Sequence, residues 1–171
     1  MSACGRLART LVALWALAVI AAACASNTER GGGASSRPES LSVTDIQTTQ
    51  ESTVATIHIV IAGQTISAHL YDNPTARELA QRLPMTLTFR DFNRLEKIAS
   101  LPEPLTTQGV PAGDDPEVAD IGYYGPTQDL VLYYGDVGYW NGIVRVGQFD
   151  SNQLTLVQNQ PDGFHVTIEN D

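Results

Sequence analysis

The stretch VATIHIVIAGQTISAHLY, residues 54–71, alternates apolar and polar side chains on both sides of Gly63-Gln64. Such alternation is typical of β-strands that bury one face, and a two-residue loop that begins with glycine favours a type II′ turn. The hairpin would then pair Ile61 with Ile66, and one of its faces would be apolar throughout. We therefore predict an antiparallel β-hairpin at the start of the folded domain.

This register places His58 directly opposite His69 on the polar face of the hairpin. Two imidazoles side by side can bind a metal ion. No third ligand is evident from the sequence, so an exposed pair of histidines without a metal role is the favoured alternative.

Residues 73–84 have the pattern of a short helix, with Asn73 as a suitable N-cap and Pro74 at the first helical position. A strand is predicted at 85–89, and residues 92–117, with four prolines, are predicted to be a long loop with one short turn around 93–99. Further short strands are predicted at 118–124, 129–134, 142–149, 154–158 and 163–169. Many short strands separated by Gly, Pro and Asn favour a mainly β domain, and a closed barrel leaves no exposed edge.

The N-terminus has the pattern of a secretory signal, residues 1–23, with two arginines followed by the uncharged run LVALWALAVIAAA. Ala21-Ala22-Ala23-Cys24 resembles the lipobox of bacterial lipoproteins, although Ala21 replaces the usual leucine. This resemblance implies a diacylglycerol (and palmitate) on Cys24. The alternative is an ordinary cleaved signal. We therefore expect an exported lipoprotein, anchored through lipid to the outer face of a bacterial cell membrane.

Residues 24–52 are predicted to be the lipidated cysteine and a flexible tether rich in Ser, Thr, Gly and Gln, and residues 53–171 the domain. After cleavage, 8 basic and 19 acidic residues would remain, which disfavours nucleic-acid binding. The only cysteines are Cys4 and Cys24, so the domain has none for a disulfide, a thiolate nucleophile or a metal site.

Three segments together resemble the bacterial cyclophilin-like fold family over roughly residues 54–169. They are DNPTARELAQRLPMTLTFRDFNRLEKIASLPEPL, ADIGYYGPTQDLVLYYGD and GIVRVGQF, at 72–105, 119–136 and 142–149. Ala119 stands where the family usually has glycine. The resemblance implies a closed, cyclophilin-type barrel of about eight strands with one or two short helices.

The resemblance does not imply a reaction. Enzymatic cyclophilins use the arginine of an F-H-R strand, which polarises the prolyl amide, and this chain has no F-H-R segment. Arg90 in Thr-Phe-Arg-Asp-Phe is the nearest counterpart and a weak catalytic candidate. The favoured alternative is a surface arginine paired with Asp91.

Aromatic residues gather between 123 and 140, and exposed Tyr and Trp suit recognition of peptides or small molecules. Alternation predicts that Tyr134 lies in the core, whereas Tyr133 and one of the 123/124 pair point outward. The alternative is that these rings fill the barrel. Asp136 could orient a ligand, but it would more commonly cap its own turn. The candidate ligand-binding residues are Arg90, Phe92, Tyr123, Tyr133, Asp136 and Trp140.

The sequence leaves three functions open: a tethered module that binds an exported peptide or small molecule, a prolyl isomerase acting on exported proteins, and a non-catalytic envelope scaffold. The first is favoured, with the lipid bilayer as a further partner and no cofactor. The acidic loop 114–117 lacks the spacing of a calcium loop. The binding module requires that Arg90, Tyr133 and Trp140 line one concavity.

Overall fold

The computed structural model describes residues 51–171, which form strands joined by short turns and two short helices. The strands are β1 (Thr53–Ile61), β2 (Gln64–Tyr71), β3 (Met85–Phe92), β4 (Glu96–Ser100), β5 (Gly113–Asp114), β6 (Asp120–Tyr124), β7 (Asp129–Tyr133), β8 (Trp140–Asn141), β9 (Ile143–Phe149) and β10 (Phe164–Asn170). The helices are α1 (Pro74–Gln81) and α2 (Leu154–Gln158), and a 3-10 turn, Ser151–Gln153, precedes α2.

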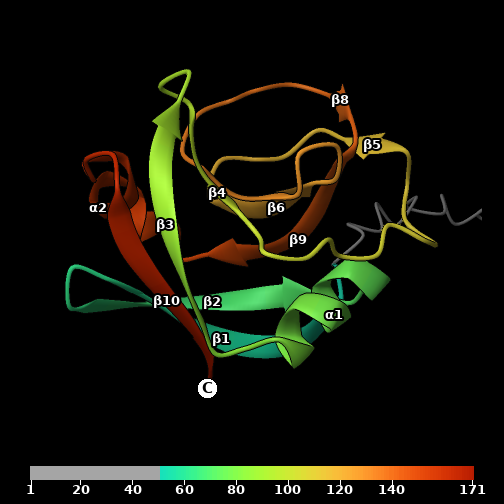
Figure 1. The fold of residues 1–171 in the computed structure, drawn as a ribbon, viewed down its shortest axis with the longest axis horizontal. Coiled ribbons are helices and arrows are strands. Elements are labelled where there is room, and N and C mark those ends of the chain that lie inside the picture. The colour runs from blue at the N-terminus through green and yellow to red at the C-terminus, as the bar shows by residue number, and fades with distance from the viewer. Residues whose placement is uncertain (1–50) are drawn as a thin grey trace, which may run out of the picture. The chain divides into compact units, whose positions relative to one another are not determined.

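Eight strands close into an antiparallel barrel in the order β1-β10-β3-β4-β7-β6-β9-β2, and β5 and β8 form a separate two-stranded sheet (Figure 1). The prediction of a mainly β fold with a closed barrel of about eight strands and one or two short helices is therefore confirmed, and the helices number two within residues 51–171.

Alternate residues of each strand fill the barrel, because successive side chains of a strand point to opposite faces. Ile57, Ile59 and Ile61 are almost fully buried for this reason. The helices lie on opposite sides of the barrel (Figure 1), and α1 buries Ala76 and Leu79 against the core. The predicted start of α1 is confirmed, since the Asn73 side chain accepts a hydrogen bond from the Ala76 N–H at 2.9 Å.

The predicted hairpin is present, but its register is shifted. The loop residues are Ala62 and Gly63, both with positive φ (51° and 77°), which is the signature of a type I′ turn rather than II′. Ile59 therefore pairs with Ile66 instead of Ala68. A shift of two residues keeps every side chain on the same face, so the apolar pattern alone could not distinguish the two registers.

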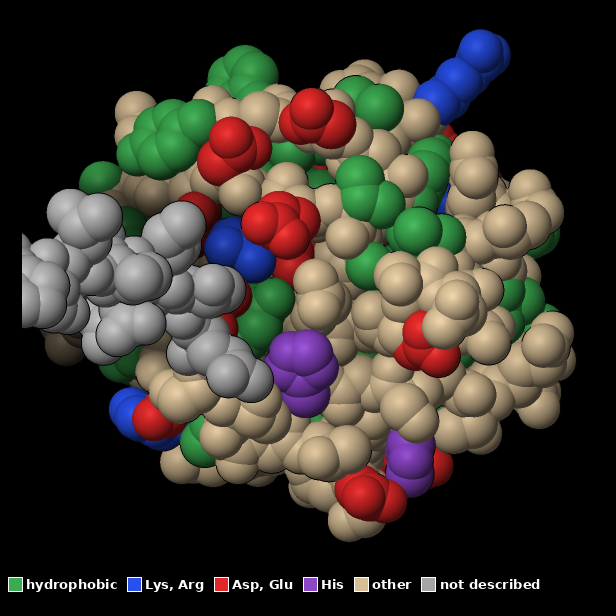
Figure 2. Space-filling model, turned by 180° about the vertical axis from the view of Figure 1, so that it is seen from behind, with side chains coloured by type: hydrophobic (Ala, Val, Ile, Leu, Met, Phe, Trp, Pro, Cys, Tyr) green, Lys and Arg blue, Asp and Glu red, His purple; other side chains and the backbone are tan. Residues whose placement is uncertain are grey.

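The predicted pairing of His58 with His69 is wrong for the same reason: Ser67 lies opposite His58. His58 Nε2 instead lies 3.7 Å from Asp171 Oδ1, and the His69 ring packs edge-on against Tyr71. The histidines visible on one face of the domain lie apart (Figure 2). Within residues 51–171, no group of three or more His, Cys, Asp or Glu side chains is placed to hold a metal ion.

Two further predictions are corrected. Residues 96–100 are a strand rather than part of a long loop, and the alternation is missing because Lys97, Ile98 and Ala99 are all buried. Residues 154–158 are a helix rather than a strand. Asp150 is the N-cap of the preceding 3-10 turn: its carboxylate accepts a hydrogen bond from the Asn152 N–H, and the chain then continues as helix.

The signal peptide, Cys24 and most of the tether lie outside the described residues. At the start of the described part, the Ser52 carbonyl accepts a hydrogen bond from the Asp72 N–H at 2.7 Å. No helix within residues 51–171 is both long and apolar enough to cross a membrane.

Candidate ligand-binding groove

A cavity of about 530 Å³ lies on the outer face of the barrel, and we call it the outer groove. Its floor is formed by Ile98 of β4, Val131 of β7 and Ile143 of β9, which are almost completely buried. The cavity falls within the roughly 300–1,000 Å³ of small-molecule sites. An apolar floor of this size can hold a small molecule or a few residues of a peptide.

Five of the six candidate ligand-binding residues line this groove: Arg90, Phe92, Tyr133, Asp136 and Trp140. They come from β3, β7, β8 and the segment between β7 and β8, so the fold brings together residues that are far apart in the chain. The geometric condition for the binding module, that Arg90, Tyr133 and Trp140 line one concavity, is met.

The sixth candidate, Tyr123, faces the barrel interior with 1% of its surface exposed, and its hydroxyl accepts a hydrogen bond from the Leu105 N–H. Tyr124 is the outward member of the pair and lines the groove. Tyr134 is not in the core, because it lies half-buried at the barrel rim, where its hydroxyl donates to Asp91. Tyr133 does leave the barrel interior, as predicted.

Tyr133 is nonetheless covered, with 1% of its surface exposed. Its ring packs against Gly122 of the neighbouring strand, where a Cβ atom would stand 2.6 Å from Tyr133 Cε2. A glycine at this position therefore allows the ring to lie against the sheet and to form part of the groove surface.

The segment after β7 forms one wall of the groove. The N–H groups of Tyr134 and Gly135 both donate to the Leu95 carbonyl in the β3–β4 turn, at 3.0 and 2.8 Å. Further along, Trp140 Nε1 donates to the Val137 carbonyl at 3.1 Å, and Asp136 accepts a hydrogen bond from a nearby backbone N–H. Asp136 therefore caps its own turn, as the alternative reading predicted, while also lining the groove.

Arg90 is exposed at the edge of the groove, and its guanidinium carbon lies 5.6 Å from the centre of the Phe92 ring. The predicted pairing with Asp91 is wrong. Asp91 points to the other face of β3, as expected for successive strand residues, and pairs with Lys97 at 2.8 Å.

Lys97, the only lysine of the chain, lies beneath the groove with 2% of its side chain exposed. Its ammonium donates to Asp91 Oδ2 and to the Gln160 carbonyl, at 2.8 and 2.7 Å. Hydrogen bonds from Lys97 and Tyr134 lower the pKa of Asp91. These contacts fix the β3–β4 hairpin, whose outer face carries Arg90, Phe92 and Glu96.

Glu96 is a groove residue that the sequence analysis missed. Burial, together with the nearby charge of Asp129, raises the pKa of Glu96 to about 7. Asp129 is itself 8% exposed and accepts hydrogen bonds from Ser100 Oγ and Thr127 Oγ1, at 2.5 and 2.6 Å. A charged residue inside a predicted loop is expected to be exposed to solvent. The sequence pattern therefore gave no indication that Glu96 lines a groove.

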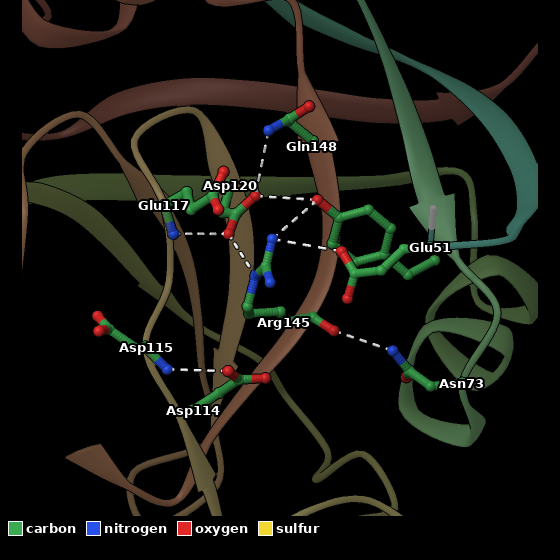
Figure 3. Close-up of polar contacts among 9 residues, drawn as sticks. Glu51, Asn73, Asp114, Asp115, Glu117, Asp120, Arg145 and Gln148 are labelled. Carbon is green, nitrogen blue, oxygen red and sulfur yellow. Dashed lines mark hydrogen bonds and ion pairs between the residues drawn. The ribbon is translucent and has the colours of Figure 1, made fainter. Parts of the chain in front are cut away.

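A second polar centre lies where β2, β6 and β9 meet (Figure 3). Asp120 is fully buried and accepts hydrogen bonds from Arg145 Nε, the Glu117 N–H and Tyr71 Oη, at 2.6, 2.8 and 3.0 Å. Burial and Asp120 raise the pKa of Tyr71. Tyr71, Asp120 and Arg145 come from three different strands and contact one another, so the cluster acts as a structural joint. In the acidic loop 114–117, the Asp114 carboxylate accepts a hydrogen bond from the backbone N–H of Asp115 (Figure 3).

A larger cavity of about 890 Å³ lies where β3 and β4 diverge, because these strands pair only between residues 90–92 and 96–98. Its lining includes Arg90 but none of the other candidate residues. The outer groove is therefore the site that gathers the predicted side chains.

The comparisons with known proteins agree with this architecture. The model of the Cyclophilin-like family matches residues 59–169. This chain belongs to that family. Its cyclophilin-like barrel is also similar to the solution structure of the hypothetical protein AF2241 from Archaeoglobus fulgidus, with a TM-score of 0.54 and 16% identity over 72% of this chain and 99% of that one. At this identity the likeness shows the fold alone, and no curated protein matches.

Proposed function

We propose that this cyclophilin-like protein is a binding module that holds a peptide or small molecule in its outer groove, without the prolyl isomerase activity of the enzymatic cyclophilins. The observation that carries the proposal is the convergence of Arg90, Phe92, Tyr133, Asp136 and Trp140 on one cavity.

The groove has the composition of a recognition site. Its buried floor of Ile98, Val131 and Ile143 offers apolar area, and Trp140, with 61% of its surface exposed, stands at the rim. Aromatic side chains of this kind contribute much of the binding energy in protein interfaces. A ligand that covers Trp140 would remove this apolar surface from water.

The experiment uses the full chain in phospholipid nanodiscs and the blocked tetrapeptide Ala-Ala-Pro-Phe as probe. We expect peptide-induced NMR shifts around the groove and a loss of affinity of at least about fivefold in Trp140→Ala, since an interfacial aromatic contributes roughly 1 kcal/mol or more. Tyr139→Ala is the matched control, because Tyr139 is equally exposed (59%) but does not line the groove. It should change affinity less than about twofold.

Equal losses in the two variants, or shifts elsewhere on the barrel, would contradict the proposal. The same samples test prolyl isomerisation, the second candidate, which the position of Arg90 in the groove favours. If exchange spectroscopy shows that the protein speeds cis–trans interconversion of the peptide's prolyl bond, and Arg90→Ala abolishes this effect, the protein is a prolyl isomerase instead. A peptide that does not bind at all would favour the envelope scaffold.

We also propose that the protein is an exported lipoprotein held at the outer face of a bacterial membrane by acylated Cys24. Support comes from the sequence pattern of residues 1–24. This pattern consists of an arginine-containing segment, an uncharged apolar run and a stretch of small residues before the cysteine. Two or more acyl chains give stable anchoring where a single chain gives only marginal binding.

Metabolic labelling with palmitate in a bacterial host tests the anchor. We expect label in the wild-type chain and in Cys4→Ala, because Cys4 lies within the predicted signal, and none in Cys24→Ala. Label that persists in Cys24→Ala, or an unlabelled wild-type chain recovered in the soluble fraction, would refute it.

A further inference from the structure

The outer groove carries an excess of negative charge. Three carboxylates line it, those of Glu96, Asp129 and Asp136, against the single cation of Arg90. The domain as a whole is acidic, with 16 acidic and 6 basic residues between 51 and 171. Acidic side chains are also spread over the face shown in Figure 2.

Glu96 is the carboxylate that we expect to contact a ligand. The strand register places it between Phe92 of β3 and Tyr133 of β7 on the outer face of the barrel. Asp129 and Asp136 each accept hydrogen bonds from neighbouring groups, whereas the Glu96 carboxylate has no hydrogen-bond or ion-pair partner within residues 51–171. A half-buried carboxylate without a partner is unfavourable, and a bound cation would relieve that cost.

Tyr133 is the second group without a partner. The residue is almost fully buried and lines the groove, and its hydroxyl has no hydrogen-bond partner within residues 51–171. Because no side-chain nitrogen or oxygen that is sealed from solvent in this part of the chain lacks a partner, the hydroxyl keeps some access to solvent. The hydroxyl can accept a hydrogen bond from an N–H donor, and the faces of Tyr133, Tyr124, Phe92 and Trp140 attract cations. Unpartnered acceptors and aromatic rings therefore surround the same space.

We infer that the ligand of the outer groove carries a protonated amine on an apolar stem, with the ammonium bound between Glu96 and Tyr133. A lysine side chain of an exported polypeptide has this chemistry, as does a free arylalkylamine. The inference rests on the proposed function, since it specifies the ligand class of the same groove.

An organic cation fits the groove better than a metal ion does. Calcium takes six to eight oxygen ligands, and no group of three or more suitable side chains exists within residues 51–171. An alkyl or aryl stem, by contrast, would cover Ile98, Val131 and Ile143 while its ammonium reaches Glu96. Arg90 lies at the β3 edge of the groove, so a ligand could also place an acceptor there.

Binding of the amine should depend on pH through Glu96. The charged and titratable groups that share the groove with it are Asp129, Tyr133, Asp136, Arg90 and Tyr124. Burial and Asp129 raise the pKa of Glu96 to about 7, so the carboxylate is largely neutral at pH 5 and charged at pH 8. An amine that stays protonated over this range should therefore bind more tightly as the pH rises.

Three water-soluble probes with the same ring test the inference: 2-phenylethylamine, neutral 2-phenylethanol and anionic phenylacetate. They are titrated by NMR into the full chain in nanodiscs, with empty nanodiscs as the blank. At pH 8 we expect the amine to bind about tenfold more tightly than the alcohol, because hydrogen bonds to charged groups contribute roughly 1.5–3 kcal/mol, and the anion to bind most weakly. At pH 5 the preference should shrink.

Glu96→Gln should remove the preference for the amine while leaving the affinity for 2-phenylethanol within about twofold. Glu169→Gln changes the net charge equally on an exposed part of β10 and should leave the preference intact. The inference would be overturned if the amine and the alcohol bound equally, if the anion bound most tightly, or if the two variants had equal effects. Each of these results would still leave the outer groove as the proposed binding site. Failure of all three probes and of the tetrapeptide would instead count against the proposed function.

Discussion

Replacing Asp120 by alanine is expected to lower the free energy of unfolding by about 3–5 kcal/mol, the cost of removing one partner of a buried ion pair. Asp120 is fully buried, and the Arg145 side chain, 17% exposed, donates to it at 2.6 Å. Without the carboxylate, Arg145 keeps only Glu51 as an ion-pair partner within residues 51–171, at 3.3 Å. Tyr71 loses its acceptor as well.

Urea denaturation of the full chain, followed by circular dichroism, measures this change. Asp72→Ala is the matched control, because it removes one partner of the exposed pair with Arg77 and should cost no more than about 1 kcal/mol. The double variant Asp120→Leu with Arg145→Met should recover only part of the loss, because it removes the unpaired charge but leaves Tyr71 Oη and the Glu117 N–H without their acceptor. Similar losses for Asp120→Ala and Asp72→Ala would show that the cluster is not a structural joint.

The closed barrel could be predicted because β1, β2, β3 and β10 bury mainly one face and so alternate in sequence. The strands β6, β7 and β9 are buried on both faces, and they were found because Gly, Pro and Asn residues mark their ends. The strand that was missed, β4, does not alternate: Ile98 lies under the groove, whereas Lys97 and Ala99 face the interior. The helix α2 was predicted as a strand because it is five residues long, and Val157 is its only buried residue. A pattern this short fits either period.

The part of the candidate site that could be predicted consists of residues whose type is conspicuous in the sequence. Exposed aromatic residues such as Trp140 were identified because the segment around them is unusually rich in rings. The floor residues Val131 and Ile143 resemble ordinary core, and only the fold shows that they face outward. Glu96 could not be found, because its unusual environment arises from burial in the folded barrel and, after that, from Asp129, which lies on another strand.

Gly147→Ala is expected to destabilise the fold by roughly 3 kcal/mol or more, at the upper end of the range for overpacking. A Cβ atom at position 147 would lie 2.2 Å from the His69 carbonyl oxygen, which belongs to the backbone of β2 and cannot rotate away. The two strands would have to separate. Their joint is short, with three paired positions, and it closes the barrel.

Gly125→Ala is the matched control, because the nearest atom to its Cβ would be a Thr107 methyl group at 3.5 Å, an ordinary contact. It should change stability by no more than about 0.5 kcal/mol. Since β9 also supplies Ile143 to the groove floor, separation of β2 from β9 should weaken tetrapeptide binding in Gly147→Ala. A variant as stable as Gly125→Ala would mean that β2 and β9 accommodate a methyl group, and that barrel closure does not depend on glycine at this position.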